Sequence, residues 1–166
     1  DTNHDCDRWF LQIECFDPHE PFYVPKDWKT EYEDDYENPG KDWPPYHHVT
    51  EEESLARHYR YKYAELLELC DKYLGKLLDK FDEDTMLIVN TDHGYLLGEH
   101  GWWSKVVMPC YDEIAHIPLF IHDPRFAADG QRRKEIVQTI DLPATVLEFF
   151  NVGLPKNMQG RPIRTV

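Results

Sequence analysis

The residues best suited to chemistry in this chain follow one apolar run, Met86 to Val89, which predicts a buried strand. Asp92 then supplies a carboxylate, His93 and His100 supply imidazoles, and Lys105 supplies an ammonium. In open α/β sheets, ligands bind beyond the carboxyl ends of the strands. Side chains at this position are therefore candidates to hold a hard cation or to contact an anion. The alternative is an Asx turn at Asp92 with solvated histidines beyond it.

These residues belong to a segment, 84–105, that contains Thr-Asp-His-Gly and then Gly-Glu-His-Gly-Trp-Trp-Ser-Lys. Upstream, residues 17–22 read Asp-Pro-His-Glu-Pro-Phe, and downstream come Ile-Pro-Leu-Phe-Ile at 117–121, an Asp-Leu-Pro-Ala-Thr segment at 139–147 and Gln-Gly-Arg-Pro at 159–162. In this order, the segments resemble the later half of the sulfatase catalytic domain in the alkaline phosphatase superfamily. The resemblance covers nearly the whole chain.

The resemblance implies a role for each candidate site residue. Asp92 and His93 match positions that hold the metal of the family, Ca²⁺, with Mg²⁺ or Mn²⁺ as alternatives because imidazole nitrogen is a poor ligand for hard calcium. Lys105 matches an anion-contacting lysine, which acts as a point charge. His19 matches a substrate-binding histidine that contacts sulfate or donates a proton to the leaving oxygen. His100 is expected to contact substrate or to hydrogen-bond behind the ligands.

The family's nucleophile is not found in this sequence. Sulfatases carry a Cys or Ser, followed by any residue, Pro, any residue and Arg, and convert it to formylglycine. The cysteines and serines of the chain do not fit this pattern: Cys6, Cys15, Cys70, Cys110, Ser54 and Ser104. The family's first metal-binding acidic pair is also missing, since Asp34-Asp35 lies in a charged loop. We therefore expect residues 1–166 to be the C-terminal portion of a catalytic domain that is inactive alone. Because part of the metal ligands is missing, we expect the metal site of this portion to be unoccupied or to bind the metal weakly.

Two classes of function remain open. The first is a sulfuric ester hydrolase acting on a small molecule or glycan, with a phosphate or phosphonate monoester hydrolase of the same superfamily as the runner-up. The second is a non-catalytic domain that keeps the fold and an anion or metal site. The missing part of the domain is the expected partner, and an exposed sheet edge would permit self-association.

The hydrophobic periodicity predicts an α/β fold. The resemblance to the sulfatase family implies that this fold is a partial, alkaline-phosphatase-like three-layer domain with a mostly parallel sheet and helices packed on it. Strands are expected at 9–16, 85–91 and 117–122, and helices at 50–81 and 141–151. The first and second strands would lie parallel in one sheet because a helix connects them.

Local signals refine these expectations. Thr50 and Glu53 fit a capping box, and Asp141 fits a helix cap. Residues 17–49 are expected to form a long, proline-rich, acidic loop. The resemblance implies that this loop lines part of the substrate pocket, and the alternative is a solvent-exposed surface loop. The pair Trp102-Trp103 fits either a pocket wall or the core, and we favour the core.

The composition and net charge of the chain limit the classes of partner that it can bind. The chain has 166 residues, of which 41% are hydrophobic, and a net charge of −14. This is enough apolar material for one core, whereas the charge argues against nucleic acid or an anionic membrane as a partner. Four cysteines without a Cys-x-x-Cys pair favour free, buried or half-buried thiols. No stretch is long and apolar enough to span a bilayer. A signal peptide could lie in the N-terminal part that we expect to be missing, so the sequence does not indicate the cellular compartment.

Overall fold

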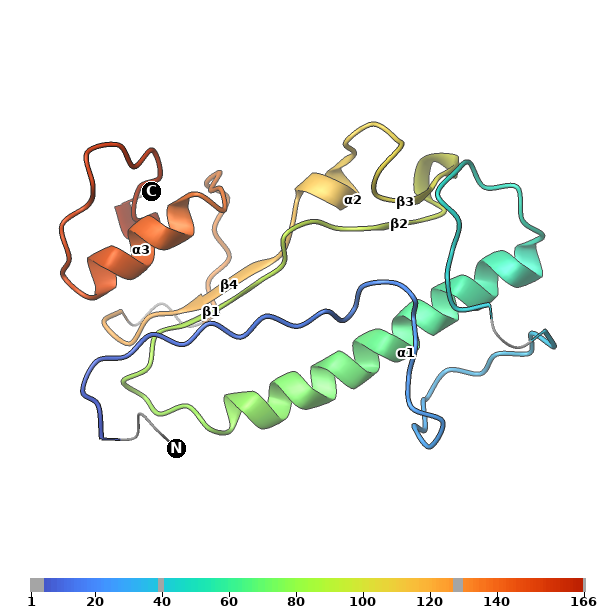
Figure 1. Ribbon diagram of the computed structural model, residues 1–166, viewed down its shortest axis with the longest axis horizontal. Helices are drawn as coiled ribbons and strands as arrows, with labels where there is room; N and C mark the ends of the chain where they lie inside the picture. Colours follow the sequence, from blue (N-terminus) through green and yellow to red (C-terminus); the bar gives the residue numbers. More distant parts are fainter. Residues whose placement is uncertain (1–4, 39–40, 127–129, 166) are drawn as a thin grey trace. The chain divides into compact units, whose positions relative to one another are not determined.

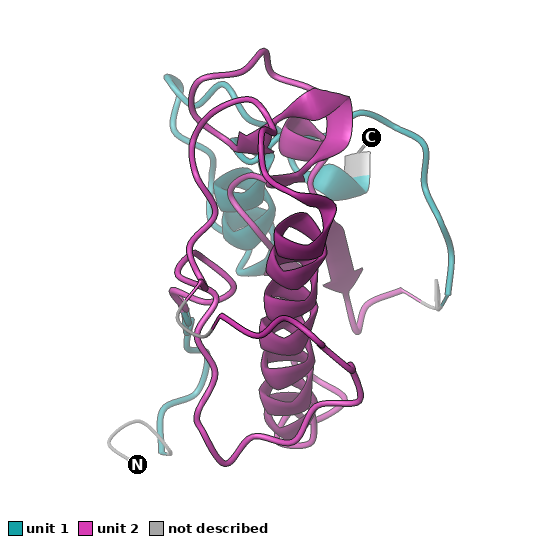
Figure 2. Ribbon diagram, turned by 90° about the vertical axis from the view of Figure 1, so that its right-hand side faces the viewer, with its two compact units in different colours: residues 1–13, 127–166 teal, residues 14–126 magenta. Residues whose placement is uncertain are grey.

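The computed structural model describes residues 5–38, 41–126 and 130–165. The chain forms two compact units, which Figure 2 shows in different colours. Residues 14–126 make one unit, and residues 1–13 together with 127–166 make the other. All candidate site residues lie in the unit 14–126, so the fold of that unit decides their geometry.

The predicted α/β class is confirmed for the unit 14–126, which combines one long helix with short strands (Figure 1). Its elements in chain order are α1 (Glu53–Leu78), β1 (Leu87–Asn90), β2 (Leu96–Leu97), the 3-10 turn η1 (Glu99–Gly101), β3 (Trp103–Ser104), α2 (Asp112–Ala115) and β4 (Leu119–His122). The strands expected at 85–91 and 117–122 correspond to β1 and β4. Strand β1 is half-buried where a buried strand was expected.

The expected parallel pairing is wrong for the described residues. Strand β1 pairs with β4 in antiparallel register, Leu87 opposite His122 and Asn90 opposite Leu119. Strands β2 and β3 form a second antiparallel pair. The expected parallel partner of β1 was the segment 9–16, which has no ladder, and both described strand pairs are antiparallel.

The strand expected at 9–16 is also absent, because these residues are described without any ladder. Their large apolar side chains are exposed; Phe10 is 61% and Phe16 is 70% accessible. An apolar pattern favours extended backbone, but a strand exists only where a neighbour supplies hydrogen bonds. The described part of the chain provides no such neighbour for this segment.

Helix α1 confirms the long amphipathic helix but begins three residues later than expected. Its N-cap is Glu52, without a side-chain hydrogen bond to the helix, so the predicted capping box is wrong. The Val49 amide donates to the Gly101 carbonyl at 2.8 Å. The Thr50 N–H donates to Glu51 Oε2 at 3.0 Å, and the helix begins only after Glu52.

The core of this unit lies along one face of α1. Leu66 packs with Phe22 and Val24. About two to three turns earlier on the helix, Ala56 and Tyr59 pack with Trp103, which is fully buried. Helix α1 thus anchors the loop after residue 16 through Phe22 and the segment after η1 through Trp103. These two anchored segments carry His19 and Lys105.

The other unit contains helix α3 (Asp141–Phe149) and the 3-10 turn η2 (Ile163–Thr165). The helix expected at 141–151 is confirmed, and Pro143 lies in its first turn, where its missing N–H is harmless. Asp141 is not the cap, because Ile140 occupies that position. The Asp141 carboxylate instead accepts the backbone N–H groups of Gln138 and Arg161, each at 2.9 Å.

The cysteines are free, as expected, but only Cys70 is partly buried. Cys6, Cys15 and Cys110 are exposed, which corrects the expectation of buried or half-buried thiols. Within the described residues, no helix combines the length and the apolar character that a bilayer crossing requires.

Candidate active site

Asp92 and His93 lie in the turn that follows β1. The Asp92 carboxylate accepts the His93 backbone N–H at 2.8 Å, and its other oxygen lies 3.5 Å from Nε2 of His93. Partial burial raises the pKa of the Asp92 carboxyl, but the hydrogen bond and the charge of His93 outweigh it, so the pKa falls below its ordinary value. Asp92 is therefore a carboxylate at neutral pH, as a cation ligand must be.

The ring of His93 is oriented by the next residue. Nδ1 lies 3.0 Å from the Gly94 carbonyl oxygen, which can only accept, so Nδ1 carries the proton. Nε2 is then the atom free to bind a metal, on the same side as the Asp92 carboxylate. A backbone carbonyl behind a ligating histidine is a common way to fix its tautomer.

Gly94 explains why the turn after β1 has its observed path. Its N–H donates to the Ile114 carbonyl at 2.9 Å, and a Cβ atom at this position would collide with the Glu113 carbonyl. Only glycine permits this close approach to helix α2. Gly94 therefore fixes the turn of Asp92 and His93 against α2.

His19 and Lys105 come together on Glu20. The Lys105 ammonium donates to Glu20 Oε2 at 3.0 Å, and Nδ1 of His19 lies 3.4 Å from the same oxygen. Nδ1 also lies 2.6 Å from the Glu20 backbone carbonyl. Sequence reasoning missed Glu20. Its signal in the sequence was its place between His19 and Pro21 in the His-Glu-Pro element.

Tyr95 forms part of the surroundings of Lys105. Its ring packs edge-on against Phe22 with a centroid distance of 5.5 Å, and the Lys105 ammonium lies 5.6 Å from its centroid. Burial, followed by the negative charge of Glu20, raises the pKa of Tyr95. The Tyr95 hydroxyl therefore stays protonated at physiological pH.

His100 has a different partner from the one expected. Its Nε2 lies 3.1 Å from both carboxylate oxygens of Glu113, and its ring stacks on Tyr111 with centroids 3.9 Å apart. No hydrogen bond among the described residues joins it to Asp92 or His93. His100 thus braces helix α2, the helix that contacts Gly94.

The candidate residues form two pairs. In the described part of the chain, no hydrogen bond or ion pair links Asp92 or His93 to His19 or Lys105. The same part contains no group of three or more His, Cys, Asp or Glu side chains placed to hold a metal ion. The resemblance to the sulfatase family implies that Asp92, His93, His19 and Lys105 converge on one cleft, and this convergence stays a prediction.

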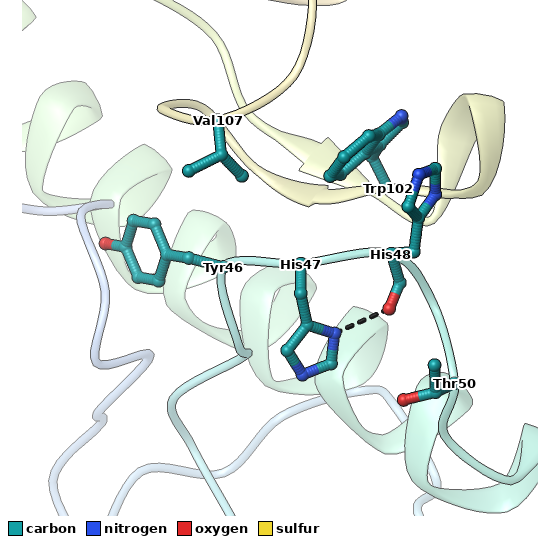
Figure 3. Close-up of a pocket in the computed structure, with 6 residues that line it drawn as sticks. All are labelled: Tyr46, His47, His48, Thr50, Trp102 and Val107. Carbon is teal, nitrogen blue, oxygen red and sulfur yellow. Dashed lines mark hydrogen bonds between the residues drawn. The ribbon is translucent and has the colours of Figure 1, made fainter.

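A surface hollow of about 450 Å³ lies beside η1 and apart from the candidate residues (Figure 3). Its lining consists of Tyr46, His47, His48, Thr50, Trp102 and Val107. The rings of His48 and Trp102 stack with centroids 3.5 Å apart. The tryptophan pair is thus divided: Trp103 belongs to the core, as favoured, whereas Trp102 lines this pocket.

Comparisons with known proteins agree with this picture. A family model described as Sulfatase matches residues 2–152. An arylsulfatase of Clostridium perfringens is 26% identical over 94% of this chain and 37% of its own length. An N-acetylglucosamine-6-O-sulfatase of Bacteroides thetaiotaomicron is 30% identical over 65% of this chain and 20% of its own length. The chain therefore spans little more than a third of such relatives, or less.

A solved structure supports the same relationship in three dimensions. It shows a protein in complex with its substrate D-glucosamine-2-N,6-O-disulfate. The two chains share a TM-score of 0.62 and 28% sequence identity over 68% of this chain and 23% of the other. The match covers only part of the solved chain, as it does for the curated relatives.

Proposed function

The chain belongs to the sulfatase family, and from this premise we propose that it supplies the anion-contacting and cation-contacting residues of a sulfuric ester hydrolase. The observation that carries the proposal is the meeting of His19 and Lys105 at Glu20. These two residues match the family's anion-contacting positions and are 86 positions apart in sequence. A common anion site requires two such side chains to lie close together, and their shared contact with Glu20 brings them there.

Each side chain has a chemical task in this proposal. The Lys105 ammonium holds a non-bridging oxygen of the sulfate group as a point charge. His19 keeps its proton at Nδ1, toward the Glu20 carbonyl, so that Nε2 is the atom that faces a ligand. A protonated Nε2 donates to a sulfate oxygen or to the leaving alcohol oxygen. The buried hydroxyl of Tyr95 contributes no charge of its own.

The donors present fit a calcium site only in part. Calcium takes about 6–8 oxygen ligands, and of the two proposed donors only the Asp92 carboxylate is of that type. His93 offers a nitrogen, which suits a softer metal. Since the described residues contain no third donor placed with them, these residues alone do not fit a complete Ca²⁺, Mg²⁺ or Mn²⁺ site.

The proposal also holds that these 166 residues do not turn over substrate by themselves. None of the cysteines or serines stands in a Cys/Ser-x-Pro-x-Arg sequence, so the formylglycine nucleophile has no source within them. The substrate class we propose is a sulfate ester of a small molecule or a glycan. A structural neighbour bound to a sulfated glucosamine supports the glycan option.

The experiment compares the protein translated from the complete reading frame with the 166-residue chain. Both are assayed on an aryl sulfate and on the matching aryl phosphate, each beside its Asp92→Ala and Lys105→Ala variants. We expect sulfate hydrolysis by the former, reduced at least about 100-fold in both variants, and none by the latter. Faster phosphate hydrolysis would favour the phosphate or phosphonate ester alternative. The absence of both activities, with anion binding retained, would favour a non-catalytic domain.

A further inference from the structure

Glu20 is a buried carboxylate between two candidate anion-contacting groups. Its side chain is 0% exposed, whereas that of Lys105 is 10% and that of His19 is 36% exposed. Exposure thus increases from the carboxylate to the two groups that would meet a ligand. Glu20 lies behind them and does not itself face solvent.

One oxygen of this carboxylate is unsatisfied, which is unusual for a purely structural ion pair. Glu20 Oε1 is buried without a hydrogen-bond partner among the described residues. Buried polar atoms are rarely left unpaired in native proteins, and such exceptions need an explanation. A buried ion pair is also a weak source of stability, because desolvation offsets its attraction. Stability alone therefore does not account for Glu20.

The backbone beside Lys105 is strained as well. Ser104 is fully buried and has a φ of 79°, a left-handed conformation that is unfavourable for a residue with a side chain. Strain of this kind persists where the surrounding structure enforces it and is common at functional sites. The pairing of β3 with β2, in which Ser104 lies opposite Leu96, enforces it here. Lys105 directly follows this strained residue in the sequence, and its ammonium donates to Glu20 Oε2.

We propose that Glu20 is a positioning residue that holds the Lys105 ammonium and the His19 imidazole together as one anion site. Its carboxylate fixes Nζ of Lys105, and its carbonyl and carboxylate both lie against Nδ1 of His19. Nε2 of His19 and the other N–H donors of Lys105 then serve the anion. This proposal rests on the proposed function, since it assigns the supporting residue of the same site.

The direction in which the sulfate affinity changes when Glu20 loses its charge distinguishes a positioning role from a purely electrostatic one. Removing a negative charge next to an anion site would by itself strengthen anion binding. Loss of positioning would weaken it. The affinity for inorganic sulfate is therefore measured by isothermal titration calorimetry for the wild-type chain, Glu20→Gln and Glu20→Asp. The aspartate variant keeps the charge and withdraws the carboxylate by one methylene, and it serves if the glutamine variant does not fold.

The matched control is Glu65→Gln, because Glu65 forms a partly buried ion pair with Lys62 on helix α1. We expect Glu20→Gln to bind sulfate about 10-fold more weakly than the wild type, as the loss of a charge-assisted hydrogen bond implies. Glu20→Asp should also bind more weakly, and Glu65→Gln should bind as the wild type does. Unchanged or tighter binding in a folded Glu20 variant would overturn the positioning role.

A second readout keeps this result separate from the proposed function. The acetylation rates of Lys105 and Lys62 by acetic anhydride are followed by mass spectrometry. Glu20→Gln should accelerate the reaction of Lys105 only, and Glu65→Gln that of Lys62 only. If the wild type binds no sulfate, the anion site and the proposed function both fail, although selective acetylation would still establish the pairing. An unchanged Lys105 rate in Glu20→Gln would overturn the pairing itself.

Discussion

The Nζ atom of Lys105 lies 3.0 Å from Oε2 of Glu20, although these residues are 85 positions apart in the sequence. The lysine leaves β3 and the glutamate lies in the loop anchored by Phe22. Both anchors pack on helix α1, through Trp103 and Phe22 respectively. The helix is therefore the common support on which the two halves of the candidate anion site meet.

The first prediction concerns the energy of this pair. Lys105→Met should lower the free energy of unfolding by roughly 3 kcal/mol, because it leaves the buried Glu20 carboxylate without its counter-charge. The double variant Lys105→Met/Glu20→Gln should recover most of this loss, since no unpaired charge remains. Urea unfolding of both single variants and the double variant gives the coupling. Strictly additive effects would show that the two side chains do not interact.

A second prediction tests the turn that carries Asp92 and His93. Gly94→Ala should destabilise the chain by about 1–3 kcal/mol, since the new Cβ collides with the Glu113 carbonyl. Gly75→Ala is the matched control, because nothing lies within 4 Å of a Cβ at that position on α1. It should stabilise the helix by about 0.5–1 kcal/mol. Thermal unfolding measures both, and equal effects would contradict the described turn.

Stability in acid should depend on Asp141. The backbone N–H groups of Arg161 and Gln138 hold the pKa of this carboxyl below its ordinary value. The carboxylate therefore stabilises the fold above the unfolded pKa of about 3.9, and this contribution is lost as pH falls through the lower folded pKa. Asp141→Asn should remove this part of the pH dependence, whereas Asp71→Asn, at an exposed position of α1, should not. Urea unfolding between about pH 2 and pH 7 measures the free energy of unfolding of each variant across this titration.

Metal addition should have little effect on this chain. Asp92 and His93 supply two donors, and the described residues place no third beside them. Because a bound ligand stabilises the folded state in proportion to the logarithm of its concentration over Kd, millimolar CaCl₂ or EDTA should leave the unfolding temperature unchanged. Asp92→Asn serves as the control. A clear rise with calcium that disappears in this variant would show a more complete metal site than the described donors provide.

The exposed apolar segment 9–16 should promote self-association. Trp9, Phe10, Leu11 and Ile13 are each 48–61% exposed, and this extended segment has no ladder partner among the described residues. Exposed apolar surfaces of this kind commonly mark a protein–protein contact, and in a solution of this chain the available partner is a second copy. Sedimentation velocity should show a concentration-dependent increase in mass, which Phe10→Ser/Ile13→Ser reduces. A monomer at all concentrations would contradict this prediction.

Local features of this chain could be predicted from its sequence because neighbouring residues specify them. The apolar positions of α1 recur along one helical face, so the helix follows from its own residues, and Asp92 and His93 follow β1 directly. The α/β class was predicted in the same way, from the periodicity of apolar residues. The motif itself placed Lys105 beside a predicted site, but it said nothing about the partner of that lysine.

Only the tertiary structure decided which distant residues meet. Near the start of α1, Val49 pairs with Gly101 and Glu51 accepts the Trp103 Nε1–H, two long-range contacts that the local capping signal at Thr50 does not contain. The direction of β1 depends on β4, and the strand expected at 9–16 lacks a neighbour among the described residues. The charge of Lys105 is balanced by Glu20, a residue that its own segment does not contain. Ladder partners and buried counter-charges are long-range contacts, so no local pattern of residue types encodes them.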